Sequence, residues 1–151
     1  MKRIAAIDIG SNAVRMLICY VIPFGKENIY QKNSYLRLPL RLGEDSFSDG
    51  IISEDKIKTL SEALISFKYI MRVHKVQEYQ IYATSALRES RNSTSVILKI
   101  KKVTGLNINI ITGLKEAKII SEGNLLPKLE YNKTYLYVDV GGGSTEYSIL
   151  K

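Results

Sequence analysis

Two segments of the chain, residues 6–12 and 137–144, repeat the same pattern of residue types. Each is an apolar run that contains an aspartate and continues into glycine and small polar residues. A carboxylate at the end of a strand can hold a hydrated Mg²⁺ ion, and glycine lets backbone N–H groups approach phosphate oxygens closely. One such segment is a weak signal, because tight hairpins use the same residues. Two of them predict a pair of loops that hold a phosphate chain from opposite sides.

Two charged residues between these segments are further candidates for phosphate chemistry. Arg88 follows a strand predicted at 80–84 and lies in a predicted loop, 85–91, where a guanidinium suits a phosphate group. The alternative is a surface arginine paired with Glu89. Glu116 lies in the first turn of a predicted helix, where an acidic residue more often only complements the helix dipole. Taken singly, neither residue identifies a site.

The motifs follow one another in an order that, in combination, resembles the exopolyphosphatase/guanosine pentaphosphate phosphohydrolase family. The resemblance extends from about Arg3 to the end of the chain. The matching segments are 6–12 with Arg15 and Met16, 41–43, 83–89 with Asn92, 112–113 with 116–117, and 138–146. The single pieces are not specific, whereas their order and spacing together are.

The resemblance implies a role for each matching residue. Glu116 matches the family's catalytic glutamate, a general base that activates the attacking water, and Arg88 matches an arginine that contacts substrate phosphate. Asp139 and Glu146 match acidic residues that position metal and water, and Asp8 is a third candidate ligand for Mg²⁺ or another divalent cation. The residues that match the two phosphate loops are Gly10, Ser11, Asn12, Arg15, Gly141, Gly142, Gly143, Ser144 and Thr145.

The resemblance also implies the fold, an α/β ribonuclease-H-like domain of the actin-like ATPase superfamily with a mixed five-stranded sheet flanked by helices. Residues 1–130 would form the first actin-like domain, and residues 131–151 the first β-hairpin of a second. The implied reaction is hydrolytic release of the terminal phosphate from inorganic polyphosphate or guanosine pentaphosphate. Because the implied active site lies between two domains, we expect little or no activity from these 151 residues alone.

The sequence departs from the family pattern at two positions near the implied site. Lys115 stands where many members have a second acidic residue, and its pairing with Glu116 would weaken that glutamate as a base. Ala13 replaces the commoner serine and removes one hydroxyl from the first loop. Two other functions stay open: a non-catalytic module that binds phosphate or an alarmone, and a kinase or ATPase of the same superfamily.

Composition sets outer bounds on the function. Of the 151 residues, 45% are hydrophobic and 25% are charged, which excludes a disordered chain, a collagen-like chain and a disulfide-stapled miniprotein. The net charge of +7 is spread along the chain, so we expect no nucleic-acid partner. Cys19 is the only cysteine, and we expect it to be a buried hydrophobe in a reducing compartment. The apolar run 16–24 is too short to span a bilayer and follows no signal peptide, so we expect a cytoplasmic protein with no membrane partner.

Hydrophobic periodicity predicts the elements that position these residues. Residues 4–9, 14–22 and 29–38 favour strands, and the short turns between them predict antiparallel hairpins. A helix is predicted from an N-cap at Ser53 to about Val73. The remaining predicted elements are a strand at 80–84, a helix ended by Gly105 with Val96, Ile97, Ile100 and Val103 on one face, a strand at 108–111, a helix at 115–126, and strands at 135–140 and 146–150.

The hairpin predicted at 135–150 would normally help to begin a second domain. Its strand edges would then lack partners within these 151 residues. Unpaired edges invite pairing with another chain, so the sequence suggests a homodimer formed through them.

Overall fold

The computed structural model describes residues 1–25, 27–120, 133–141 and 145–150. Its main sheet has the strand order β3-β2-β1-β4-β5. The three antiparallel strands are β1 (Lys2–Ile9), β2 (Val14–Phe24) and β3 (Glu27–Leu38). The two strands that run parallel to β1 are β4 (Glu78–Ala83) and β5 (Asn109–Ile110). The predicted mixed five-stranded α/β sheet and its antiparallel hairpins are therefore confirmed.

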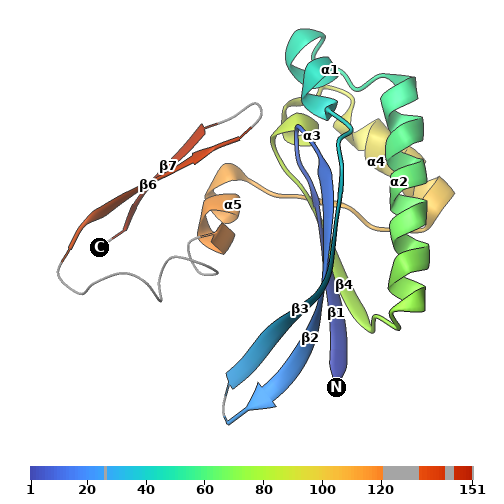
Figure 1. The fold of residues 1–151 in the computed structure, drawn as a ribbon. Coiled ribbons are helices and arrows are strands. Elements are labelled where there is room, and N and C mark those ends of the chain that lie inside the picture. The colour runs from blue at the N-terminus through green and yellow to red at the C-terminus, as the bar shows by residue number, and fades with distance from the viewer. Residues whose placement is uncertain (26, 121–132, 142–144, 151) are drawn as a thin grey trace.

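The helices are arranged unequally on the two faces of this sheet. Their bounds are α1 (Leu42–Ser48), α2 (Glu54–Val73), α3 (Ser85–Glu89), α4 (Ser93–Thr104) and α5 (Gly113–Ile120). Figure 1 shows α2 and α4 on one face and α5 on the other. The face with α2 and α4 is the core face, and we call the other one the open face.

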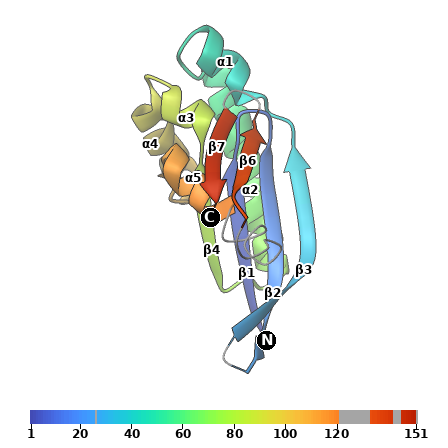
Figure 2. The ribbon, with the colours of Figure 1, turned by 90° about the vertical axis from the view of Figure 1, so that its left-hand side faces the viewer.

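Two further strands, β6 (Tyr135–Val140) and β7 (Thr145–Leu150), form a separate antiparallel sheet. Figure 2, viewed from the side of this hairpin, shows it in front of α5 and the main sheet. Both predicted strands are confirmed. The division into a first domain at 1–130 and a second beginning at 131 stays a prediction, as does a homodimer through the hairpin edges.

The hydrophobic core lies between the main sheet and its two long helices. Along β1, Ala5, Ile7 and Ile9 are buried, whereas Asp8 between them is half-exposed. Alternation with a period of two is expected for a strand that has one face in the core. The strand therefore presents apolar residues to the core and leaves its other face available for polar groups.

The apolar stripe of α2 packs against this sheet as predicted. Ser53 is the N-cap, and its Oγ accepts a hydrogen bond from the Lys56 N–H at 3.3 Å. The buried residues of the predicted stripe are Ile57, Leu60, Leu64, Phe67 and Met71. Spacings of three and four residues place these side chains on one side of a helix, which fixes α2 against the sheet.

The predicted loop at 85–91 is wrong in its first part, since residues 85–89 form α3. Thr84 makes no side-chain cap hydrogen bond, so local capping does not explain this helix. Tertiary packing does: Leu87 is fully buried, and Ser46 Oγ of the unpredicted helix α1 donates to the Ala86 carbonyl at 2.7 Å. A helix of five residues offers too little periodicity to be recognised in a sequence.

Three smaller differences concern α4, β5 and α5. Val103, predicted on one face of α4 with Val96, Ile97 and Ile100, is 62% exposed, and the buried stripe ends in Thr104 instead. The strand β5 is shorter than predicted at 109–110. The helix α5 begins earlier than predicted, at Gly113, and the predicted helical residues 121–126 lie outside the described part of the chain.

The environment of Cys19 agrees with its predicted role as a small hydrophobe. The residue is buried, and burial raises the pKa of its thiol, an effect that the nearby Lys32 charge partly offsets. Within the ranges that the structure describes, no helix has both the length and the apolar character needed to cross a bilayer.

Candidate active site

The candidate site lies where three parallel strands end. Strands β1, β4 and β5 are neighbours and run in the same direction, so their carboxyl ends meet at one edge of the sheet. The loop at 10–13 follows β1, helix α3 follows β4 and helix α5 follows β5. Ligand sites of open α/β sheets lie at this edge. The topology therefore brings together the first predicted loop and the two elements that contain Arg88 and Glu116 (Figure 1).

The loop after β1 is held by backbone hydrogen bonds. The Gly10 N–H donates to the Ala13 carbonyl at 3.1 Å and closes the turn. The Ser11 carbonyl accepts from the Gly43 N–H at 2.9 Å, and the Asn12 carbonyl accepts from the Arg41 N–H at 2.9 Å. The predicted motif segment 41–43 thus lies against the first loop and fixes its shape.

Gly43 allows this close approach because it lacks a side chain. A Cβ atom there would lie 3.1 Å from the Ser11 Cβ and 2.8 Å from a ring carbon of Phe47, closer than packed carbons tolerate. A larger residue would displace the Phe47 ring and crowd Ser11 of the first loop. This packing gives a physical reason for glycine within the segment 41–43.

The first loop is also tied to helix α3. The Ser11 and Ser85 hydroxyl oxygens lie 2.7 Å apart, and both residues are buried. Ser85 follows Thr84, whose N–H donates to the Ile9 carbonyl at 3.2 Å. Sequence reasoning missed Ser85, because a contact across 74 positions leaves no local signal. Ser11 remains a predicted phosphate ligand, and its hydroxyl already bonds to α3.

Arg88 and Glu116, the two predicted catalytic residues, are in contact. Arg88 Nη1 lies 3.2 Å from Glu116 Oε2 and also donates to the Ile111 carbonyl at 3.1 Å. Its Nε donates to Glu89 Oε1 at 3.0 Å, so the alternative pairing is present as well. The side chains of Arg88 and Glu116 are only 22% and 20% exposed. Arg88 belongs to α3 and not to a loop, and its guanidinium bridges from α3 to the start of α5.

Glu116 lies at the N-terminus of α5, as predicted. Its N–H donates to the Thr112 carbonyl at 2.9 Å, and Thr112 Oγ1 accepts from the Lys115 N–H at 3.2 Å. The helix dipole therefore favours the charged carboxylate at this place. Lys115 Nζ lies 5.2 Å from the centroid of the Tyr82 ring, a cation–π contact with β4.

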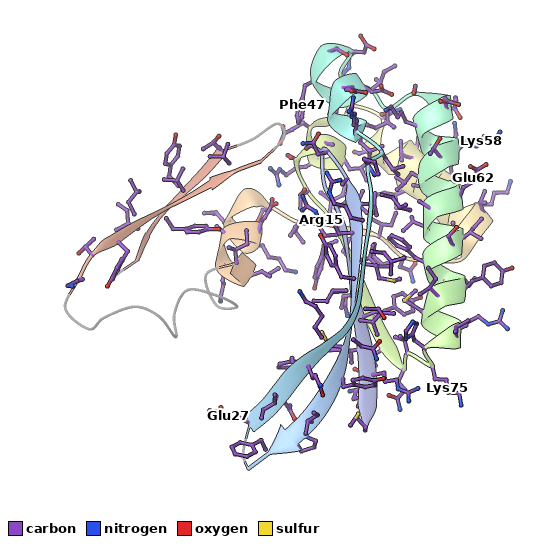
Figure 3. All side chains as sticks on the ribbon, in the orientation of Figure 1. Arg15, Glu27, Phe47, Lys58, Glu62 and Lys75 are labelled. Carbon is purple, nitrogen blue, oxygen red and sulfur yellow. The ribbon has the colours of Figure 1, made fainter. Side chains whose placement is uncertain are left out.

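Asp8 and Arg15 face each other across β1 and β2. They are register partners, and Arg15 Nη1 lies 2.9 Å from Asp8 Oδ2. Burial raises the pKa of Asp8, while the Arg15 charge and hydrogen bond partly offset that rise. Figure 3 shows Arg15 on the side of the sheet away from α2, the open face. The predicted metal ligand Asp8 is thus held by a predicted phosphate ligand.

The second predicted loop is described in part. Gly141 follows β6 and Thr145 begins β7, while Gly142, Gly143 and Ser144 lie outside the described residues. Asp139 and Glu146 are register partners in this hairpin. Among the described residues no group of three or more His, Cys, Asp or Glu is arranged to hold a metal ion. Carboxylates are nevertheless ligands suited to Mg²⁺, which needs only one or two of them.

Comparison with known proteins gives one consistent result. A family model described as the Ppx/GppA phosphatase family matches residues 34–151. The bifunctional 3-dehydroquinate synthase/phosphatase of Fusobacterium nucleatum is 34% identical over 96% of this chain and 22% of its own length. The guanosine-5'-triphosphate,3'-diphosphate pyrophosphatase of Aliivibrio fischeri is 30% identical over 96% of this chain and 28% of its own length.

A solved structure agrees with these sequence matches. The crystal structure of an exopolyphosphatase from Cytophaga hutchinsonii superposes with a TM-score of 0.87 and 28% identity over 98% of this chain and 46% of that one. The chain thus spans less than half the length of each of these proteins. The match supports the predicted fold and places the candidate site within the shared part.

Proposed function

This chain belongs to the Ppx/GppA phosphatase family, and on that premise we propose that it contributes the first half of an active site that hydrolyses phosphoanhydride bonds. The substrate is inorganic polyphosphate or guanosine pentaphosphate, from which the terminal phosphate is released. The observation that supports this best is the contact of Arg88 with Glu116 at 3.2 Å, beside the loop at 10–13. An anion ligand and a candidate base meet where α/β sheets bind ligands.

In the proposed reaction Glu116 acts as general base. It takes a proton from a water molecule while the water oxygen attacks the terminal phosphorus. The bond from that phosphorus to the bridging oxygen breaks, and its electron pair leaves with the shortened phosphate chain. The proton then passes from Glu116 to solvent, and the carboxylate is restored.

Arg88 prepares both the base and the substrate. Its guanidinium pairs with Glu116, with Nη1 3.2 Å from Oε2. A bound phosphate competes for the same guanidinium, because charge-assisted hydrogen bonds from arginine suit phosphate as well as carboxylate. Phosphate binding therefore frees Glu116 to accept a proton, and Arg88 stabilises the charge that develops on the transferred phosphoryl group.

The remaining predicted residues bind and neutralise the phosphate groups. The N–H groups of Ser11 and Asn12, in the turn that the Gly10 N–H closes, and the loop around Gly141 and Thr145 are the proposed phosphate ligands. Mg²⁺, held by Asp8 or by the Asp139 and Glu146 pair, would neutralise charge on the phosphate oxygens. The hard carboxylate oxygens of these residues fit that ion.

Two alternatives follow from the same site. The first is a non-catalytic phosphate-binding or alarmone-binding module, which would use the loop at 10–13 and Arg88 as anion ligands without Glu116 acting as a base. The relatives reported above have names of phosphatases or exopolyphosphatases, which favours hydrolysis over the kinase or ATPase alternative. A cytoplasmic location is part of the proposal and agrees with the buried free cysteine.

Measuring phosphate release from polyphosphate and from guanosine pentaphosphate in the presence of Mg²⁺ tests the proposal. Loss of a general base lowers a rate by about 10²–10⁴-fold, so we expect Glu116→Gln to abolish whatever release the chain supports. Glu62→Gln is the matched control, since Glu62 points outward from α2 in Figure 3. Release above background that Glu116→Gln leaves unchanged would contradict the proposed role of Glu116.

A further inference from the structure

Four residues on the open face form a row across neighbouring strands. The register pairs Arg37 of β3 with Arg15 of β2, Arg15 with Asp8 of β1, and Asp8 with Tyr82 of β4. Register partners in neighbouring strands lie on the same face of a sheet. Arg15 lies on the open face in Figure 3, so the whole row belongs to that face.

The row contains a like-charge pair that a structural role does not explain. Arg15 and Arg37 are direct partners on antiparallel strands, where Cβ atoms lie about 4.5–5.5 Å apart and like charges destabilise the sheet. Asp8 forms an ion pair with Arg15 at 2.9 Å. Arg37 is exposed and makes neither an ion pair nor a side-chain hydrogen bond within the described ranges. One positive charge of the pair is therefore uncompensated.

A further cation lies at the opposite end of the row. Lys115 is exposed on α5, with Nζ 5.2 Å from the centroid of the Tyr82 ring. The row with Lys115 thus contains three cations and one carboxylate. Three strand spacings make it about 14 Å long, more than one phosphate group occupies. Asp8, in the middle of the row, is two positions before Gly10, so the row passes beside the loop that is proposed to bind the terminal phosphate, with Arg37 at one end and Tyr82 with Lys115 at the other.

We propose that this row, Arg37–Arg15–Asp8–Tyr82 with Lys115, binds the phosphate groups that follow the terminal one in a linear condensed phosphate. It rests on the proposed function and makes the substrate class more specific: inorganic polyphosphate is preferred because a long chain reaches both ends of the row. A bound polyanion supplies the counter-charge that Arg15 and Arg37 lack. The repulsion in the free protein is thus relieved on binding, so the row favours phosphate chains over single phosphate ions.

Calorimetric titration of the 151-residue chain tests this row. The ligands are orthophosphate, tripolyphosphate, long-chain polyphosphate and guanosine pentaphosphate. Loss of one charge-assisted contact lowers affinity by about tenfold or more. We therefore expect Arg37→Gln and Lys115→Gln each to lower the affinity for long-chain polyphosphate by that factor. Arg37→Gln leaves orthophosphate binding unchanged, because a single phosphate bound between the first loop and Glu116 does not reach the Arg37 end of the row.

Two controls make the same charge changes on the helix α2, which covers the core face. They are Arg72→Gln, matched to Arg37, and Lys58→Gln, matched to Lys115; Figure 3 shows Lys58 pointing away from the sheet. If a row variant and its control weaken the binding of long-chain polyphosphate equally, binding depends only on the net charge of the protein. That result would overturn the proposal that the row is a binding site. Equal weakening of guanosine pentaphosphate and long-chain polyphosphate by Arg37→Gln would overturn the preference for chains.

Thermal unfolding separates a binding role from a structural one. Since Arg37→Gln removes a repulsion, we expect the melting temperature at low salt to stay the same or rise. A lower melting temperature would assign Arg37 to the fold and overturn the proposal. If Arg88→Gln lowers the affinity for orthophosphate while Arg37→Gln changes the affinity for none of the four ligands, the row is not a binding site and the proposed function stands. If the wild-type chain binds no phosphate species, both are wrong.

Discussion

The two faces of the main sheet differ in what their residues do, although the same strands supply both. The core face is apolar: Ile7 and Ile9 of β1, and Phe67 of the helix α2 that packs on this face, are at most 1% exposed. The open face has a row of charged and aromatic side chains that begins one residue before the end of β1 with Asp8. A period of two along each strand separates the face that stabilises the fold from the face that is free to bind a ligand.

The largest expected effect comes from the core face. Phe67 is among the largest fully buried side chains, and truncating a buried phenylalanine costs about 3–5 kcal/mol. We expect Phe67→Ala to lower the free energy of unfolding by that amount in urea titrations. Tyr35→Ala on the open face, where the ring is 53% exposed, is the control and is expected to change it by less than about 1 kcal/mol. Equal losses would contradict the division between the two faces.

An intermediate effect is expected where the faces end, at the bond between the first loop and α3. Removing one partner of a buried hydrogen bond costs about 1–3 kcal/mol, so Ser11→Ala and Ser85→Ala are each expected to destabilise the protein by that amount. In a double-mutant cycle the two losses should not add, since each variant already breaks the same bond. Simple additivity, measured by denaturant unfolding, would mean that the two hydroxyls do not interact.

The smallest effect concerns the pH dependence of stability. The raised pKa of Asp8 means that the folded state binds this proton more tightly than the unfolded state. The stabilisation that the protonated Asp8 carboxyl gives the folded state is therefore fully present below its unfolded pKa of 3.8. It is lost as the pH rises through the folded pKa. We therefore expect the wild type to lose stability relative to Asp8→Asn as the pH rises from 3.8 through the folded pKa of Asp8. The free energy of unfolding in urea, measured for both proteins at each pH, tests this.

Asp45 gives the control of opposite sign. Burial alone would raise the pKa of its carboxyl, but hydrogen bonds from Ser53, whose N–H lies 2.9 Å from Oδ2, and the Lys56 charge lower it. Its stabilisation is therefore present above 3.8 and is lost as the pH falls through the folded pKa. For each variant, the difference in free energy of unfolding from wild type can be plotted against pH. Slopes of the same sign for Asp8→Asn and Asp45→Asn would contradict the difference between the environments of the two carboxyl groups.

Much of the fold could be predicted from the sequence because strong periodicity and capping determine it locally. The strand at 4–9 and the helix with its N-cap at Ser53 are examples. The helix α3 could not be predicted, since buried Leu87 and contacts from α1 hold it. Arg88 was therefore recognised by type and wrongly assigned to a loop.

The candidate site divides in the same way. Arg88 and Glu116 could be found from motifs, but only the fold brings their side chains into contact. Ser85 and Arg37 could not be found, because the evidence for them is a tertiary contact and a strand register. In the sequence, Arg37 stands between Leu36 and Leu38, an alternation that is typical of a strand and does not indicate a ligand.

The central claim is that Arg88 binds phosphate and that Glu116 competes for it. The most direct measurement is the affinity of tripolyphosphate for the wild-type chain, for Arg88→Gln and for Glu116→Gln. Losing a hydrogen bond to a charged group costs about 1.5–3 kcal/mol, so Arg88→Gln should weaken binding by about tenfold or more. Glu116→Gln should strengthen binding, because it removes a negative charge and frees the guanidinium 3.2 Å away. Unchanged affinity in Arg88→Gln, or weaker binding in Glu116→Gln, would contradict the account.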